Sequence, residues 1–164
     1  MTMITLVHVV LSLVGIGSGF VVVFGLINAK RLDGWTAVFL ITTAATSITG
    51  FLFPFHKLLP SHIVGIVSLV VLAFAIVARY ACHLTGAWRW IYSVSAVLAL
   101  YLNVFVLVVQ AFQKVPALKA LAPSQSEPPF AVAQLVVLAV FIVLGVFAVK
   151  KFHAESARRA ATVS

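Results

Sequence analysis

The stretch Phe51-Leu-Phe-Pro-Phe-His-Lys-Leu-Leu-Pro-Ser-His62 interrupts a chain whose sequence is otherwise almost continuously apolar on both sides. Two prolines, two histidines and a lysine stand between two long hydrophobic runs. Its Pro60-Ser61 pair is typical of a helix start, because serine caps the first turn and proline there loses no hydrogen bond. The stretch therefore predicts a tight turn that joins two hydrophobic helices.

The composition around this turn is that of an integral membrane protein. Of the 164 residues, 63% are hydrophobic and 9% are charged, and the mean hydropathy is +1.21. In soluble domains roughly a quarter of the residues are charged. A helix needs about 20 apolar residues to cross a bilayer, so the chain has room for five or six spans and no separate soluble domain.

Five apolar runs are long enough to be spans. They lie at about residues 4–27, 35–53, 61–80, 88–112 and 130–149. The longest connection, 113–129, is rich in proline and serine and predicts an irregular loop rather than a helix. We therefore expect an all-α bundle of five transmembrane helices within residues 1–150, followed by a basic tail at 151–164.

The positions of the cations predict the orientation of this bundle. Most of the 11 lysines and arginines lie on the side that carries the tail, and only Lys57, Lys114 and Lys119 lie on the other. Cytoplasmic loops carry the excess of positive charge in membrane proteins. We expect the C-terminus in the cytoplasm and the N-terminus outside, with the three tryptophans as anchors at the cytoplasmic boundary. Orientation explains the basic charge, so no nucleic-acid partner is expected.

Several kinds of chemistry are not predicted. The acids Asp33, Glu127 and Glu155 all lie outside the spans, so the sequence offers no buried carboxylate for ion-coupled transport. There is no recognisable nucleophile with a histidine and acid partner and no glycine-rich phosphate loop, which argues against hydrolases and NTPases. A membrane redox role stays open, and the sequence leaves undecided whether the chain is an enzyme.

Polar side chains within the spans mark the candidate site. Such groups are costly in hydrocarbon and usually face other helices or a cavity. Four of them lie within roughly 3 to 6 Å of the predicted outer boundary at about 1.5 Å per residue: His8, His62, Gln110 and Gln134. His56 lies in the turn directly above. We expect these residues to line an outward-facing pocket.

The ligand of this pocket is left open by the sequence. The first and third spans of an up-down bundle lie diagonally, so His8 and His62 can face one another and hold a b-type haem. A metal ion with His56 as a third ligand, or a small redox ligand such as a quinone, is an alternative. Equally, His8, Gln110 and Gln134 can simply hydrogen-bond between helices, a gain of about 0.6 to 2 kcal/mol each, and His62 can lie at a solvated helix end.

Two further functions compete with ligand binding. Gly15 and Gly19 form a small-xxx-small pair that permits close approach of a second helix, so the chain can be a structural or accessory subunit that packs on a partner or on itself through this face. Passive passage of a small solute ranks third, because the sequence offers few polar residues toward the cytoplasmic side.

Four segments carry a resemblance to known sequences: Thr49-Gly-Phe-Leu-Phe-Pro54, Leu59-Pro-Ser-His-Ile-Val-Gly65, Ala99-Leu-Tyr-Leu-Asn-Val-Phe105 and Ser124-Gln-Ser-Glu-Pro-Pro-Phe130. They resemble segments of a group of small bacterial multi-pass membrane proteins with no known activity. The resemblance extends over most of the chain. It implies a location in the bacterial inner (cytoplasmic) membrane and nominates no catalytic residue.

Overall fold

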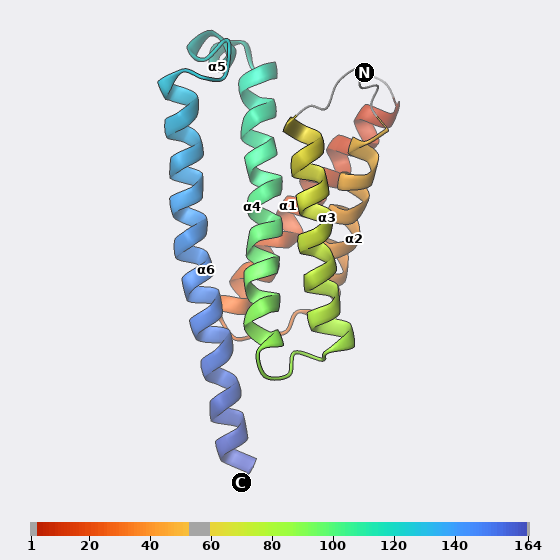
Figure 1. Ribbon diagram of the computed structural model, residues 1–164, viewed down its shortest axis with the longest axis vertical. Helices are drawn as coiled ribbons and strands as arrows, with labels where there is room; N and C mark the ends of the chain where they lie inside the picture. The colour runs from red at the N-terminus through yellow and green to blue at the C-terminus, as the bar shows by residue number, and fades with distance from the viewer. Residues whose placement is uncertain (1–2, 53–59, 164) are drawn as a thin grey trace.

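The computed structural model of the chain describes residues 3–52 and 60–163, with side chains for 3–52 and 62–152. These residues form helices and short connections, and no strand occurs among them. The helices are α1 (Met3–Ile27), α2 (Asp33–Gly50), α3 (Pro60–Ile76) with its π-helical end η1 (Val77–Ala81), α4 (Trp88–Lys114), α5 (Pro116–Leu121) and α6 (Pro128–Val163) (Figure 1).

Four of these helices are long and apolar enough to cross a membrane by length and composition. They are α1, the His62–Ala81 segment of α3 and η1, α4, and the Pro128–Phe152 part of α6. The expected all-helical membrane class is therefore confirmed at this level. The second run, α2, does not qualify, because its 18 residues include many serines and threonines.

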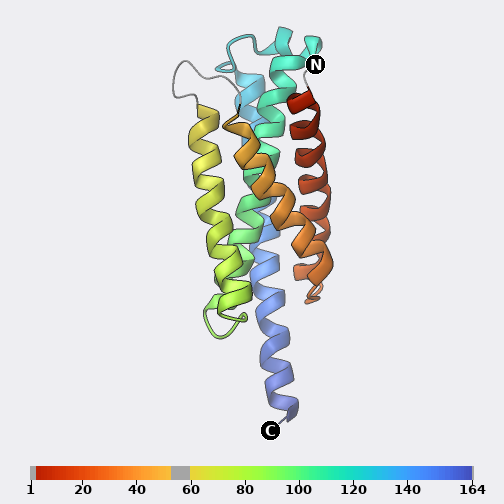
Figure 2. The same cartoon turned by 90° about the vertical axis from the view of Figure 1, so that its right-hand side faces the viewer.

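One connection differs from the expectation. The segment 113–129, expected to be irregular, contains the short helix α5, which begins at Pro116. Proline is well tolerated there because the first N–H groups of a helix have no intrahelical partner. The tail is also helical, since α6 continues to Val163. Its C-terminal part extends beyond the ends of the other helices in Figures 1 and 2.

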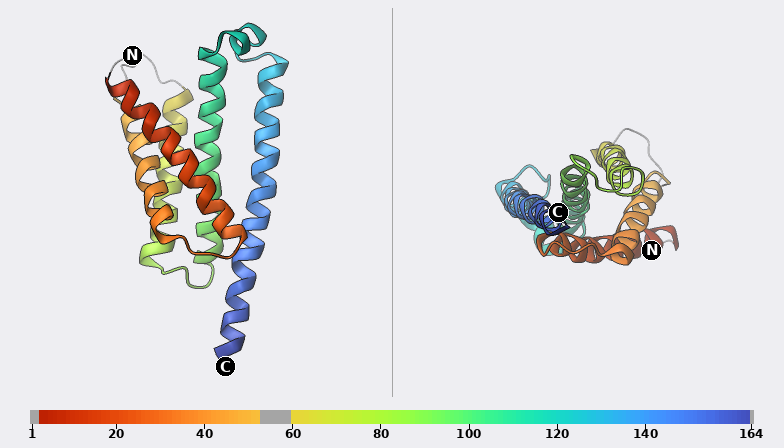
Figure 3. Two further views of the ribbon diagram at one scale, coloured as in Figure 1. Left: turned by 180° about the vertical axis from the view of Figure 1, so that it is seen from behind. Right: turned by 90° about the horizontal axis from the view of Figure 1, so that it is seen from below.

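The first four helices form a ring. α1 packs on α2 and α4, and α3 packs on the same two helices, so α1 and α3 stand across the ring from one another. α6 lies outside the ring against α4 and α1. Figure 3 shows α1 crossing the bundle obliquely, with its N-terminal end beside α2 and its C-terminal end beside α6. This tilt moves the outer end of α1 away from α4.

The glycine face of α1 packs inside this ring. A Cβ atom added to Gly19 would lie 2.6 Å from Leu100 Cδ1 and 2.8 Å from Phe39 Cε2. One added to Gly15 would lie 3.2 Å from Thr43 Oγ1. The close approach that the small residues permit is therefore to α2 and α4 of the same chain. This corrects the expectation of an external partner at Gly15 and Gly19, because their face is already covered.

Candidate functional site

The buried face of α2 carries an unusual number of hydroxyl groups. Thr36, Thr43 and Ser47 are all buried, and Leu40 is the apolar residue between them. Their spacing of 4 or 7 residues keeps them on one side of the helix. This face points into the ring, so polar groups occur inside the ring along much of the length of α2.

Each of these hydroxyls has a partner on α3 or α4. Ser47 Oγ donates to Ser68 Oγ at 3.3 Å. The Asn103 Nδ2 group donates to Thr43 Oγ1 at 3.1 Å. These contacts satisfy groups that would otherwise be costly in an apolar interior, and they tie α2 to α3 and, across the ring beside Gly15 of α1, to α4.

His8 approaches the outer end of α2 from α1. Its Nδ1 lies 2.9 Å from Thr49 Oγ1, and its Cε1 lies 3.7 Å from the Cβ position of Gly50. Thr49 Oγ1 donates its own proton to the Ala45 carbonyl at 2.8 Å. It therefore accepts a hydrogen bond from Nδ1–H, which makes Nε2 the acceptor nitrogen of a neutral imidazole.

Thr46 lies one turn below Gly50 on α2. Its Oγ1 is buried and has no hydrogen-bond partner within the described part of the chain. A buried hydroxyl without a partner costs free energy and is uncommon in folded proteins. Residues four apart share a helix face, so the Thr46 hydroxyl lies on the same side of α2 as Gly50, where the His8 ring of α1 approaches.

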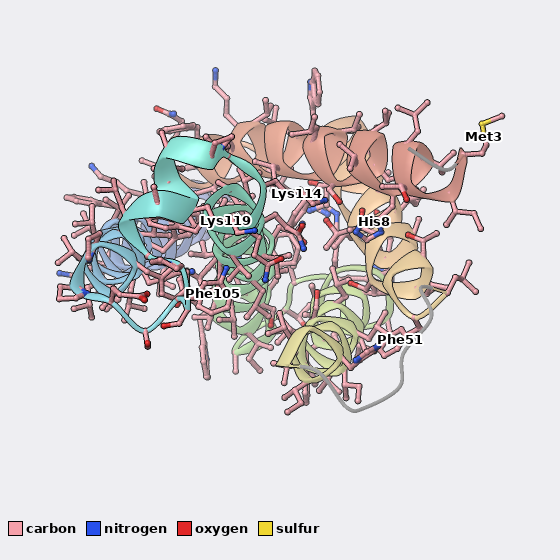
Figure 4. All side chains as sticks on the ribbon, turned by 90° about the horizontal axis from the view of Figure 1, so that it is seen from above. Met3, His8, Phe51, Phe105, Lys114 and Lys119 are labelled. Atoms are coloured by element: carbon pink, nitrogen blue, oxygen red, sulfur yellow. The ribbon has the colours of Figure 1, made fainter. Side chains whose placement is uncertain are left out.

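A lysine stands at the outer rim of the same region. Lys114 is the last residue of α4 and lies close enough for its charge to act on His8. Viewed from above in Figure 4, the Lys114 and His8 side chains both turn toward the space that α1, α2, α3 and α4 surround. We name His8, Thr46, Thr49, Asn103 and Lys114 the outer cluster.

The structure separates the four residues that the sequence grouped. The ring of His62, which is buried, packs against Phe51 with the centroids 5.8 Å apart. His8 instead contacts Thr49, two residues earlier. Successive residues on a helix differ by about 100°, so Thr49 and Phe51 point to nearly opposite sides. The last turn of α2 therefore lies between the two imidazoles.

The two glutamines are also divided. Gln134 Nε2 donates to the Phe105 carbonyl at 3.2 Å, within the contact between α6 and α4. Phe105 is two residues from Asn103 and thus on the opposite side of α4. Gln110 is seven residues from Asn103 and is half-buried on the same side. His56 lies outside the described residues, and no group of three or more metal-ligating side chains occurs in the part of the chain that is described.

A second polar cluster lies at the opposite end of the ring. Arg79, on the π-helical turn η1, is only 3% exposed and forms an ion pair with Asp33 at the start of α2. Its guanidinium lies over the Tyr92 ring, 5.3 Å from the centroid. Tyr92 Oη in turn lies 3.4 Å from Thr36 Oγ1. We name Asp33, Thr36, Arg79 and Tyr92 the inner cluster.

This inner cluster is not among the residues that the sequence predicts as a site. Helical counting offers one signal, because Arg79 falls within the apolar run 61–80, and a charged residue in a span usually has a partner. Polar side chains therefore also occur at the end of the ring that the distribution of cations predicts to face the cytoplasm.

Comparisons with protein families, with curated proteins and with solved structures find no match to this chain.

Proposed function

We propose that this protein is a five-span protein of the bacterial inner membrane whose outer cluster binds a small hydrogen-bonding ligand such as the head group of a quinol. The proposal places the N-terminus outside and the C-terminal end of α6 in the cytoplasm. It treats α2 as the fifth span, because three of the polar side chains that lower its hydropathy, Thr36, Thr43 and Ser47, are buried inside the ring.

The unpartnered Thr46 hydroxyl is the observation that carries the proposal. It lies one turn from Gly50, which the His8 ring approaches, in the proposed outer half of the ring, where a ligand can supply the missing hydrogen bond. A hydroxyl can donate or accept. A quinone carbonyl can accept a hydrogen bond from Thr46, and a quinol hydroxyl can donate one to it.

The helix arrangement suits a ligand that enters from the lipid or from the outer face. The outer ends of α1 and α4 diverge because α1 is tilted (Figure 3). Asn103 lies deeper, near Gly15, and closes the site from below through its bond to Thr43. Gln110 and Lys114 follow Asn103 at 7 and 11 residues on α4, a spacing that keeps all three on one helix face.

The two imidazoles do not favour a b-type haem. Two histidine ligands must approach opposite faces of one iron, whereas the end of α2 lies between His8 and His62. A smaller ligand needs only the His8 side of α2. The alternative of an accessory subunit loses its expected contact, since the Gly15 and Gly19 face is covered by α2 and α4.

Thermal unfolding with added ligand tests the proposal. The protein in lipid nanodiscs is titrated with a short-chain quinol and, separately, with the quinone. A ligand that binds only the folded state stabilises it by about 2.7 kcal/mol at 100 times its dissociation constant. We expect a concentration-dependent rise in the unfolding temperature for the wild type. Absence of any shift with both forms would reject the quinol assignment.

Two variants and one control locate the site. Thr46→Val removes a hydroxyl that has no partner, so the fold should keep its stability while ligand affinity falls about tenfold, or about 1.4 kcal/mol. His8→Phe should lower affinity by a similar factor. Gln134→Leu changes a polar side chain on the other side of α4 and should leave affinity unchanged. Equal loss of affinity in Gln134→Leu and Thr46→Val would place the site elsewhere.

A further inference from the structure

We propose that the ring of α1 to α4 encloses a path for a small polar solute and that the Arg79–Asp33 ion pair is its closed cytoplasmic gate. This activity goes beyond ligand binding at the outer cluster. Its test uses no ligand, so the outer site and the gate can fail independently.

Three polar contacts at successive depths define the path. From the outer end inward they are Ser47 with Ser68, Thr43 with Asn103, and Thr36 with Tyr92. Each joins α2 to α3 or α4 on the inside of the ring. Polar groups in a membrane interior usually face a neighbouring helix or a water-filled route, and here they recur along one face of one helix.

One apolar layer divides this path. Phe39 and Leu100 are fully buried between the Thr43 and Thr36 levels, and Leu40 is nearly so. Gly19 of α1 packs against the Phe39 and Leu100 side chains. Thr36 and Thr43 are seven residues apart, or about 10 Å along α2. The layer is therefore about two helical turns thick, with hydroxyl groups on both sides.

The inner cluster closes the cytoplasmic end. The Arg79 guanidinium lies beneath the Thr36–Tyr92 contact, held by the Tyr92 ring on one side and by Asp33 on the other. Arg79 is 3% exposed, whereas the Asp33 side chain is 76% exposed. The pair thus joins a buried cation to a carboxylate at the water boundary. Loss of the carboxylate leaves a buried charge whose long side chain can extend to water.

The π-helical turn supplies a way for Arg79 to move. Residues Val77–Ala81 form this turn at the end of α3, where one extra residue is accommodated in the helix. Return of the turn to α-helical geometry shifts the register by one residue, which rotates a side chain by about 100°. Because Arg79 lies within this turn, a change of register there alters how its side chain meets Tyr92 and Asp33.

The lining indicates the chemistry of the solute. Hydroxyl and amide groups line the described part of the path, and the cations Lys114 and Arg79 stand at its two ends. No acidic side chain occurs among the described residues between them. The Lys114 charge at the outer end repels cations, and the Arg79–Asp33 pair at the other end carries no net charge, so the path suits a small polar solute that is neutral or anionic.

Cysteine accessibility tests the gate directly. In a Cys82→Ser background, Thr36→Cys places a thiol just inside the Arg79–Asp33 pair, and a membrane-impermeant thiol reagent is applied to inside-out vesicles. With Asp33 present the thiol should be protected. With Asp33→Asn the thiol should react at least about tenfold faster. Removal of one partner of a buried ion pair shifts the equilibrium between the closed and the open gate by more than that factor.

Two controls separate gate opening from unfolding. Asp33→Glu keeps the carboxylate and should restore protection. Val38→Cys places a thiol on the exposed, lipid-facing side of α2 and should stay unreactive in the Asp33→Asn variant. Unchanged labelling of Thr36→Cys in Asp33→Asn would overturn the gate. Equal acceleration at Val38→Cys would also overturn it, since the ion pair would then hold the fold and not a path.

Discussion

Replacement of Gly19 by alanine tests how tightly α1 is held in the ring. The added Cβ would lie 2.6 Å from Leu100 Cδ1 and 2.8 Å from Phe39 Cε2. Favourable contacts between carbon atoms occur at about 3.5 to 4.0 Å, so the new methyl group is about 1 Å too close to both. Both neighbours are fully buried, and neither side chain has open space into which it can turn.

The cost follows from overpacking. An extra methyl group in a well-packed core typically destabilises a protein by about 1 to 3 kcal/mol through displaced side chains and backbone. The higher helix propensity of alanine offsets at most about 1 kcal/mol of this. We therefore expect Gly19→Ala to lower the free energy of unfolding by about 1 to 2 kcal/mol.

Gly17→Ala is the matched control, because it makes the same chemical change two residues earlier on α1. Its Cβ would have no neighbour within 4 Å. Both variants are unfolded in mixed micelles by increasing the fraction of a denaturing detergent, with helix content followed by circular dichroism. Equal midpoints for Gly19→Ala and Gly17→Ala would refute the packing of α1 against Phe39 and Leu100.

Three further predictions concern other contacts. Asn103→Leu removes the donor to Thr43 and should lower stability by about 0.6 to 2 kcal/mol in the same unfolding assay; an unchanged midpoint would argue against this contact. Arg89 Nη1 donates to the Phe152 carbonyl and its guanidinium lies 4.8 Å from the Phe152 ring centroid, so Arg89→Ala should speed tryptic cleavage at Lys150 and Lys151, and Arg89→Lys should do so less. Hydrogen bonds from Ser124 lower the pKa of the Glu127 carboxyl below its ordinary value of 4.5, so this carboxylate steadies its loop above that pH and loses the effect as the pH falls through the lowered pKa. Ser124→Ala should raise the Glu127 pKa in a carbon-13 NMR titration, and a pKa at 4.5 in the wild type would contradict the assignment.

The helical class of this protein could be predicted because it depends on local properties. Long apolar runs leave a backbone in lipid no alternative to internal hydrogen bonding, so each run must be a helix. The start of α3 at Pro60 and the start of α4 at Trp88 fall where the residues of the caps and the apolar runs indicate. The depth of His8 within α1 also follows from counting residues.

The partners of each side chain could not be predicted in this way. Helical spacing places Gly15, Gly19 and His8 on one face of α1, but the tilt of α1 decides which helices cover that face. The same holds for Gln134, whose contact with the Phe105 carbonyl of α4 depends on how α6 packs against α4.

Arg79 is the charged residue whose position the sequence predicted least well. The count of cations treats every arginine near a span end alike, whereas Arg79 follows the buried Leu72 and Ala75 at helical spacing and meets Asp33 and Tyr92 inside the ring.

The amino-acid sequence by itself determined that this chain is a set of helices, four of them long and apolar enough to cross a membrane, with polar groups at defined positions along them, since both properties depend on runs of neighbouring residues. Only the tertiary structure decided that the end of α2 separates His8 from His62, and that polar contacts continue from Ser47 to the Arg79–Asp33 pair. These features depend on the tilt and rotation of packed helices, which arise from contacts between residues far apart in the chain.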